Sequence, residues 1–247
     1  MVTGVAHEMN TPLGVANTAN DMITKLVDKL LSPDATAEQM RTSRQDLAEA
    51  CGLLASNLRR AHQLIRSFKQ LSSSQFIADR IECSLGEVVE DCVRTMQPEL
   101  RKKKITIETE NHLPKSILWD GFPGHLTQVI VNLIQNTSRY AYDDGGRVHL
   151  KLTTTGQSDE LAYCIEFADY GNGIDERILP KVFEPFVTTG RAEGGTGLGL
   201  AISHNIVTNL LGGSISCTSD KGKGTTFVIT LPAVAPSGGQ ATDDAHA

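Results

Sequence analysis

Residues 124–142 read Gly-His-Leu-Thr-Gln-Val-Ile-Val-Asn-Leu-Ile-Gln-Asn-Thr-Ser-Arg-Tyr-Ala-Tyr, and this stretch decides the fold of the second half of the chain. Its apolar residues recur at spacings of three and four, which predicts an amphipathic helix. Those residues are Leu126, Val129, Ile130, Leu133 and Ile134. Beside them, Gln128, Asn132 and Asn136 recur every four residues. Such a stripe of neutral amide oxygens suits a magnesium ion that already carries phosphates, and it also suits an ordinary solvated helix face.

Short alternating runs predict strands on both sides of this helix. The expected strands are residues 105–108, 148–153, 162–168, 214–218 and 225–231, and two further helices are expected at 85–103 and 198–211. Because the strands and helices do not alternate strictly, they indicate an α+β sandwich with helices on one face of a mixed sheet.

A carboxylate and two glycines follow the expected strand 162–168 in the block Asp169-Tyr170-Gly171-Asn172-Gly173-Ile174. A carboxylate at a strand end can accept a hydrogen bond from an exocyclic amine such as that of adenine. The glycines let the backbone come close to a ligand. Asp-Gly turns are also common in loops without any ligand.

A glycine-rich block, Gly194-Gly195-Thr196-Gly197-Leu198-Gly199-Leu200, opens the expected helix 198–211. It offers backbone N–H groups and the positive end of the helix dipole to a phosphate. The lysine of a Walker A loop is missing and the Rossmann spacing fails. Tight packing of a helix N-terminus would require the same glycines.

Two long helices are expected in the first half of the chain. The apolar residues Leu13, Ala16, Ile23, Val27 and Leu30 recur at threes and fours. After a break at Ser32-Pro33-Asp34, a second series falls seven apart, namely Met40, Leu47, Leu54, Ala61 and Phe68, with Cys51, Leu58 and Ile65 at the other heptad position. Such a hairpin has too little partner surface alone, so we predict a homodimer that forms a four-helix bundle.

The first helix begins with His7-Glu8-Met9-Asn10-Thr11-Pro12. A neutral imidazole is a competent phosphoryl acceptor, and an adjacent carboxylate can hold its tautomer or take its proton. The His-Glu-x-x-His zinc motif is excluded because Thr11 stands where the second histidine would be. A surface histidine near a helix start would give the same pattern without any function.

Composition excludes several classes of protein. The 247 residues carry a formal net charge of −6, which argues against a nucleic-acid surface. The five cysteines include no Cys-x-x-Cys pair, so neither a disulfide framework nor a zinc site is indicated, and a reducing cytoplasm fits best. No apolar run approaches the ~20 residues that span a bilayer, so we expect no membrane segment in this chain and a sensor segment outside it.

Together and in this order, the four blocks resemble the sensor histidine kinase family of two-component systems. A phospho-acceptor box is followed by the N, G1, F and G2 boxes of the GHKL-type, or Bergerat, ATP-binding fold, and the match runs from His7 to Pro232. The resemblance implies three parts: an all-α hairpin for dimerisation and histidine phosphotransfer over 1–77, an ATP-binding catalytic domain over 78–233, and a disordered tail over 234–247.

The resemblance also implies roles for individual residues. His7 matches the phosphorylated histidine, Glu8 its acid or base, and Thr11 a residue that assists phosphatase action on the response regulator. Asn136 matches the Mg²⁺ ligand, and residues 188–194 look like a short lid over ATP. The residues implied to contact ATP are Asn132, Asn136, Arg139, Tyr140, Asp169, Gly171, Gly173, Lys181, Phe183, Phe186, Arg191, Gly195, Thr196, Gly197, Leu198, Gly199 and Thr225.

The implied function is an ATP- and Mg²⁺-dependent autokinase that phosphorylates His7 and passes the phosphoryl group to an aspartate of a response regulator on a separate chain. An ATP-binding pseudokinase scaffold and a protein that is mainly a response-regulator phosphatase remain as alternatives. Hydrolysis of ATP, as in gyrase-like proteins, is disfavoured because their activating glutamate falls where Asn132 stands, and an amide cannot act as a general base.

Overall fold

A computed structural model describes residues 2–34, 36–72, 79–114, 117–156, 161–190 and 195–236, without the side chains of 2–7, 67 and 70–72. These residues fall into two compact units. The first comprises residues 1–72 together with 188–198, and the second comprises 73–187 together with 199–247. The expected domain 78–233 differs from this division in residues 188–198, and the expected boundary near residue 78 lies outside the described residues.

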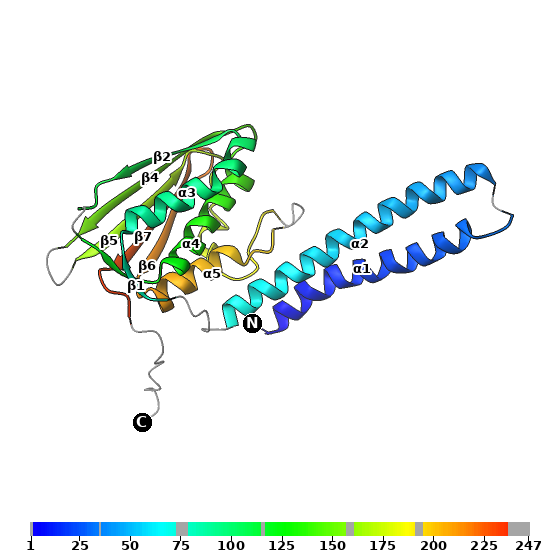
Figure 1. Ribbon diagram of the computed structural model, residues 1–247, viewed down its shortest axis with the longest axis horizontal. Coiled ribbons are helices and arrows are strands. Elements are labelled where there is room, and N and C mark those ends of the chain that lie inside the picture. The colour runs from blue at the N-terminus through cyan, green and yellow to red at the C-terminus, as the bar shows by residue number, and fades with distance from the viewer. Residues whose placement is uncertain are drawn as a thin grey trace, which may run out of the picture. The chain divides into compact units, whose positions relative to one another are not determined.

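The first unit is built on a helical hairpin of α1 (Val2–Leu30) and α2 (Ala37–Ser72), which confirms the predicted all-α hairpin (Figure 1). A reciprocal capping box starts α2. The backbone N–H of Thr36 donates to the side chain of Gln39 at 3.0 Å, and the N–H of Gln39 donates to the hydroxyl of Thr36 at 3.3 Å. Among the described residues, no helix is long and apolar enough to cross a membrane.

Burial along α2 corrects one part of the predicted heptad. The column with Met40, Leu47 and Ala61 is buried or half-buried, as expected. The second buried column contains Ser43, Ala50 and Leu64. The residues expected in that column are exposed instead: Cys51, Leu58 and Ile65. The buried residues of α2 thus include the small residues Ser43 and Ala50, whereas the larger apolar residues Leu58 and Ile65 remain exposed.

The second unit is the predicted α+β sandwich, with helices on one face of a mixed sheet (Figure 1). Its elements in chain order are β1 (Ile81–Cys83), α3 (Leu85–Lys102), β2 (Ile105–Asn111), β3 (Trp119–Gly121), α4 (Pro123–Asn136), the π-helical turn η1 (Thr137–Ala141), β4 (Gly146–Thr155), β5 (Ala162–Asp169), the 3₁₀ turn η3 (Leu179–Lys181), α5 (Gly199–Asn205), the π-helical turn η5 (Ile206–Leu210), β6 (Ser214–Asp220) and β7 (Gly224–Pro232).

The main sheet has the strand order β2-β4-β5-β7-β6. Only the β2–β4 pair is parallel, so the sheet is mixed, as the sequence predicts. Figure 1 shows α3, α4 and α5 on one face of this sheet. Side chains that face these helices are buried on the three central strands, and they are Val148, Leu150, Leu152, Tyr163, Ile165, Phe167, Phe227, Ile229 and Leu231. This alternation places one apolar layer between sheet and helices.

A small second sheet, which the sequence did not predict, closes one end of this unit. Strands β1 and β3 pair antiparallel, and each has only three residues. Trp119 is fully buried and its indole N–H donates to the carbonyl of Pro232 at 3.2 Å. Val234 pairs with Asp120, and the N–H of Ala235 donates to the carbonyl of Asp120 at 2.8 Å. The predicted tail therefore begins too early at residue 234, because these contacts hold the chain in place as far as Ala235.

Candidate functional site

Asp169 is the buried carboxylate at the end of β5, on a central strand of the sheet. In the sheet, Asp169 pairs in register with Val148 of β4 and with Thr225 of β7. The side chain accepts a hydrogen bond from the N–H of Gly171 at 3.1 Å and from the hydroxyl of Thr137. Burial raises the pKa of Asp169, and the hydrogen bonds from Gly171, Thr225 and Thr137 act against that rise.

The loop after Asp169 requires its two glycines. A Cβ at Gly171 would collide with the carbonyl oxygen of Ala141, at the end of η1. Gly173 has a φ of +65°, and a Cβ there would collide with the carbonyl of Asp220. The loop therefore lies directly against two neighbouring backbones, which only glycine permits.

The end of α4 and the turn η1 lie against this loop, where the N–H of Asn172 donates to the carbonyl of Ala141 at 2.8 Å. Asn136 is the last residue of α4 and Thr137, whose hydroxyl contacts Asp169, is the first residue of η1. Within the described part of the chain, the half-exposed Asn136 side chain forms no hydrogen bond. Arg139 is exposed and Tyr140 is half-buried on the same π-helical turn. Such π turns inside helices occur frequently at functional sites.

Asn132, one turn before Asn136, is engaged with α5. Its amide Nδ2 donates to the hydroxyl of Ser203 at 2.8 Å. A Cβ at Gly199 would collide with the amide oxygen of Asn132. The structure thus brings Asn132 together with the first residue of α5, and it shows why that residue is glycine.

Thr225 is buried at the start of β7 and belongs to a small hydroxyl network. The hydroxyl of Ser219 accepts from the N–H of Ile174 at 2.8 Å, donates to the carbonyl of Gly224 at 2.8 Å, and lies 3.0 Å from the hydroxyl of Thr225. Ser219 therefore ties the glycine loop to the β6–β7 turn. This role could not be predicted from the sequence, because Ser219 is an ordinary serine in a strand.

Three further predicted residues follow the glycine loop. The ring of Phe183 lies 5.3 Å from the ring of His204 and 6.4 Å from that of Phe227, so it is anchored on α5 and β7. Phe186 has a φ of +69°, in the left-handed region that non-glycine residues rarely occupy. Lys181 is exposed at the end of η3.

The rest of the glycine-rich block belongs to the first unit. The N–H of Gly195 donates to the carbonyl of Gly190 at 2.9 Å, and the N–H of Leu198 donates to the hydroxyl of Thr196 at 3.4 Å. Gly197 has a φ of +67°. Arg191 lies outside the described residues.

The predicted phospho-acceptor box lies in α1. His7 is a helical residue whose side chain lies outside the described residues. Glu8 is half-exposed and Thr11 is exposed, and Thr11 follows His7 by four residues, which places the two on one face of the helix. Pro12 is inside α1 and buried.

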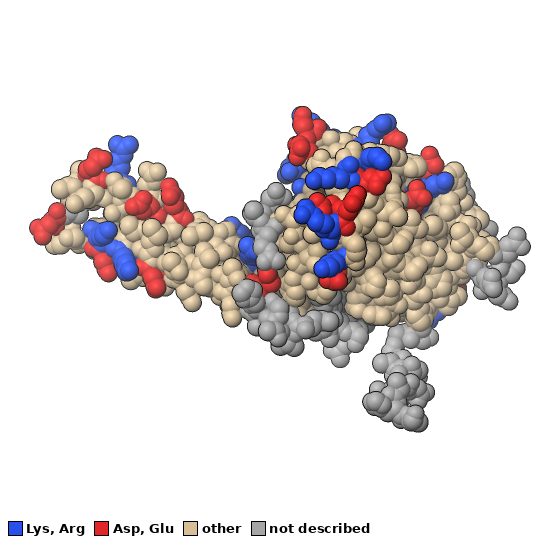
Figure 2. Space-filling view, turned by 180° about the vertical axis from the view of Figure 1, so that it is seen from behind, with Lys and Arg blue, Asp and Glu red and all other residues tan. Residues whose placement is uncertain are grey.

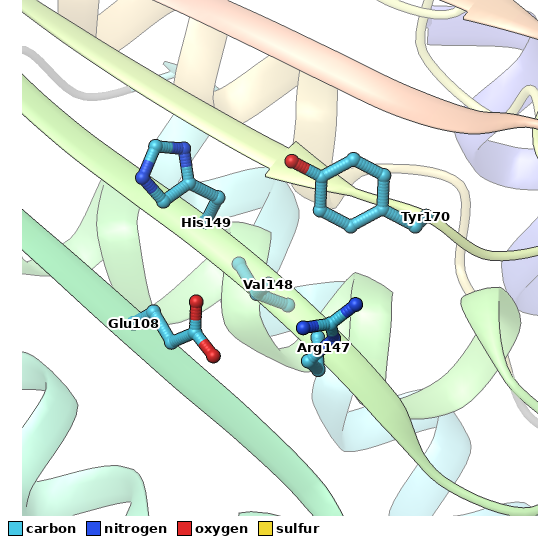
Figure 3. A pocket seen from close by; sticks show the side chains of 5 residues that line it. All are labelled: Glu108, Arg147, Val148, His149 and Tyr170. Atoms are coloured by element: carbon cyan, nitrogen blue, oxygen red, sulfur yellow. The ribbon is translucent and has the colours of Figure 1, made fainter.

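A pocket that the sequence did not predict lies over the strands, with a volume of about 280 Å³. Figure 3 shows its lining: Glu108 on β2, three consecutive residues of β4, and Tyr170 just beyond the end of β5. The three β4 residues are Arg147, Val148 and His149. None of these five residues is among the predicted site residues.

Basic and acidic side chains alternate on this unit. On the face drawn in Figure 2 they are interleaved and do not gather by sign. The carboxylate of Glu110, for example, lies 3.2 Å from His149 and 3.3 Å from His112, and these contacts lower its pKa. A mixed surface of this kind is not the basic stripe that binds nucleic acids.

Comparison with known proteins gives a consistent set of similarities. A family model described as "Histidine kinase-, DNA gyrase B-, and HSP90-like ATPase" matches residues 121–235. Autoinducer 2 sensor kinase/phosphatase LuxQ of Vibrio parahaemolyticus is 29% identical over 92% of this chain, which covers 26% of LuxQ. Sensor kinase CckA of Brucella abortus is 32% identical over 89% of this chain, which covers 23% of CckA. The chain thus spans about a quarter of the length of these relatives.

Solved structures share the fold. The crystal structure of histidine kinase ThkA in complex with response regulator protein TrrA matches 95% of this chain and 61% of the solved chain, with a TM-score of 0.65 and 20% identity. At that identity the match establishes the hairpin followed by the sandwich and nothing finer.

Proposed function

This chain belongs to the sensor histidine kinase family and carries a GHKL-type ATPase domain, and we propose that it is an ATP-dependent protein-histidine autokinase that phosphorylates His7. The phosphoryl group is then passed to an aspartate of a response regulator on a separate chain. ATP and Mg²⁺ are the proposed ligands of the site around Asn136 and Asp169.

One observation carries this proposal: the carboxylate of Asp169 is buried at the end of β5, where it could bind the adenine base. Asp169 is only 6% exposed, and its carboxylate accepts hydrogen bonds from the N–H of Gly171 and the hydroxyl of Thr137. Thr137 directly follows Asn136, so the proposed base-reading residue and the proposed magnesium ligand are joined through one hydroxyl. A carboxylate in that position accepts from the exocyclic amine of adenine.

The donor set fits a magnesium ion that arrives on phosphates. Within the described residues there is no group of three or more His, Cys, Asp or Glu side chains that could hold a metal ion. Asn136 supplies one neutral oxygen, and Mg²⁺ accepts phosphate oxygens and waters for the remaining positions. When bound with ATP, Mg²⁺ neutralises charge on the phosphate oxygens.

The reacting group of the protein is the imidazole of His7. In the proposed transfer, the unprotonated ring nitrogen forms a bond to the γ-phosphorus, while the bond from that phosphorus to the bridging oxygen breaks and ADP leaves with the electron pair. Glu8, the next residue, holds the ring tautomer or accepts the ring proton. Arg139 adds positive charge near the phosphates, where charge moves during transfer.

The remaining steps of the proposal are supported by the hairpin and by the relatives. The exposed apolar residues of α2 suit a second copy of the chain, so the active protein is proposed to be a homodimer in the cytoplasm. ThkA was solved with a response regulator, and LuxQ is described as a kinase and phosphatase. The first description supports a response regulator as partner, and the second supports a phosphatase role for Thr11.

Calorimetric titration tests the nucleotide part of this proposal. ATP with Mg²⁺ is expected to bind the wild-type chain, and Asn136→Ala is expected to bind ATP with little dependence on Mg²⁺. Gln128→Ala, one helical repeat before Asn132 on the same amide stripe, serves as the control and should keep the Mg²⁺ dependence. A wild-type chain that binds no ATP in either condition would contradict the proposed function.

A further inference from the structure

Tyr142 joins three segments at the edge of the candidate site. It directly follows η1, and its hydroxyl accepts a hydrogen bond from the backbone N–H of Tyr170 at 2.8 Å. The same hydroxyl donates to the backbone carbonyl of Arg147 on β4. Arg147 and Tyr170 stand on neighbouring strand ends in Figure 3, so one phenol holds both backbones. Tyr170 is the residue immediately after Asp169.

The ring of Tyr142 is fixed as firmly as its hydroxyl. A Cβ at Gly146 would collide with the ring, so the ring lies directly on the first residue of β4. Burial raises the pKa of the Tyr142 phenol, which keeps the hydroxyl protonated and able to donate near neutral pH. These contacts restrict the Tyr142 side chain to one conformation.

Two more hydrogen bonds run between the same segments. The N–H of Asn172 donates to the carbonyl of Ala141 at 2.8 Å, and the side-chain amide of Asn172 donates to the carbonyl of Tyr140 at 3.4 Å. The last carbonyls of a helix lack partners within the helix, and here residues of the glycine loop supply them. The turn that carries Arg139 is thereby attached to the loop that carries Gly171.

We propose that Tyr142 is a positioning residue for nucleotide binding. Its hydroxyl keeps the helix end with Asn136 and Arg139 at a fixed distance from the strand end with Asp169. This inference rests on the proposed function. Asp169 would contact the base and the helix end would contact the phosphates, so the spacing between the two matters for a ligand that reaches both. It matters little for a ligand that reaches only the strand end.

The substitution Tyr142→Phe removes only the hydroxyl. It leaves the N–H of Tyr170 and the carbonyl of Arg147 without their partner, and water can reach both because Tyr170 and Arg147 are exposed. We therefore expect a folded domain with a loosened connection. Near-UV circular dichroism checks the folded state of the variant at the temperature of the binding experiments.

Tyr163→Phe is the matched control. Tyr163 is also a tyrosine of this sheet, on β5, and its hydroxyl is buried with no hydrogen-bond partner among the described residues. The same atom is removed in both variants, but only in Tyr142→Phe does its loss break contacts between the two segments. Tyr163→Phe should bind every ligand as the wild type does.

The experiment compares ATP with Mg²⁺ against adenosine, each competing with a fluorescent ATP analogue. Tyr142→Phe is expected to bind ATP about fivefold to tenfold more weakly, in line with the net value of a hydrogen bond or two, and to bind adenosine with less than about a twofold change. A merely structural role would weaken both ligands alike.

Either an equal loss for ATP and adenosine or unchanged ATP affinity in Tyr142→Phe would overturn the positioning role, while leaving the proposed function intact. Failure of the wild-type chain to bind ATP is a distinct result, because it would remove the proposed function and this inference together.

Discussion

Asp169, proposed to bind adenine, is an unfavourable residue in the ligand-free protein because its carboxylate is buried. Its carboxylate is buried, and burial disfavours the charged form, which raises its pKa above the ordinary value of 3.8. A residue retained in a costly environment at a strand end is a frequent property of functional sites. The same burial makes Asp169 useful, because a hydrogen bond to a charged group is stronger where water is excluded.

The substitution Asp169→Asn is expected to weaken ATP binding roughly tenfold to a hundredfold, the value of about 1.5–3 kcal/mol for a hydrogen bond to a charged group. Asp144→Asn is the control, since Asp144 is exposed and its carboxylate pairs with Lys104 at 2.7 Å. Titration with ATP measures both. Equal affinities for wild type and Asp169→Asn would show that this carboxylate does not read the base.

Asp169 also predicts a pH dependence of stability. A carboxyl whose pKa is raised by folding binds its proton more tightly in the folded state, so its contribution to stability falls as pH rises from the unfolded value of 3.8 through the raised folded value. Asparagine does not titrate. The melting temperature of ligand-free Asp169→Asn relative to wild type should therefore increase between about pH 4 and about pH 7. A constant or decreasing difference in thermal melts would be inconsistent with a raised pKa.

Gly171 gives a prediction that depends on shape alone. Gly171→Ala would force the backbone of Ala141 to move, so we expect the second unit to lose about 1–3 kcal/mol of unfolding free energy and ATP affinity to fall. Urea unfolding followed by fluorescence of Trp119, the single tryptophan, measures this unit. Gly52→Ala on α2, where an added Cβ meets nothing within 4 Å, should leave that transition unchanged. A wild-type midpoint for Gly171→Ala would contradict the close packing.

Sequence patterns reveal some residues of the site and conceal others. Asp169, Gly171 and Gly173 could be selected because they follow a strand in a recognisable order. Tyr142 and Ser219 could not, because each acts by binding backbone groups that are distant along the chain. Contacts of this kind depend on strand register, which one sequence does not specify.

Helices and strands were predictable where their apolar pattern continues over many residues. Both hairpin helices and all five strands of the main sheet lie where the sequence places them. The π turns that end α4 and α5 and the three-residue strands β1 and β3 were not predicted. A π turn changes the hydrogen bonding without changing the apolar period, and three residues are too few to show alternation.

The outer face of α2 predicts how the hairpin associates. Ile65 is 48% exposed and Leu58 is 49% exposed, one heptad apart on the same face. A glutamate at a desolvated apolar contact leaves a buried charge unpaired, so Ile65→Glu should shift the proposed homodimer towards monomer. Light scattering coupled to gel filtration measures the mass. Gln63, an exposed residue two positions before Ile65, provides the control, since Gln63→Glu should remain dimeric. A dimeric Ile65→Glu would place the interface elsewhere.

At the scale of the whole molecule, the proposed phosphoryl acceptor His7 belongs to the first unit, whereas Asn136 and Asp169 of the proposed nucleotide site belong to the second. The proposed transfer requires the imidazole of His7 and the γ-phosphorus to come within about 3–3.5 Å of each other during the reaction. The proposed activity therefore depends on residues from both units.

Removal of Mg²⁺ separates the contribution of the ATP phosphates to binding from that of the adenosine part. With EDTA in place of Mg²⁺, ATP affinity should fall while adenosine affinity stays the same, because only the phosphates share the metal with Asn136. Titration of the two ligands in each buffer gives the comparison. A parallel loss for adenosine would indicate that Mg²⁺ acts on the fold and not at the phosphates.

Labelling with γ-labelled ATP and Mg²⁺ tests the central claim most directly. The wild-type chain should acquire label that is labile in acid and stable in base, as expected for a phosphorylated imidazole. His7→Gln should acquire none, while His62→Gln, which changes an exposed histidine of α2, should be labelled like the wild type. Label that persists in His7→Gln, or nucleotide binding without any label on the wild-type chain, would contradict a histidine autokinase acting through His7.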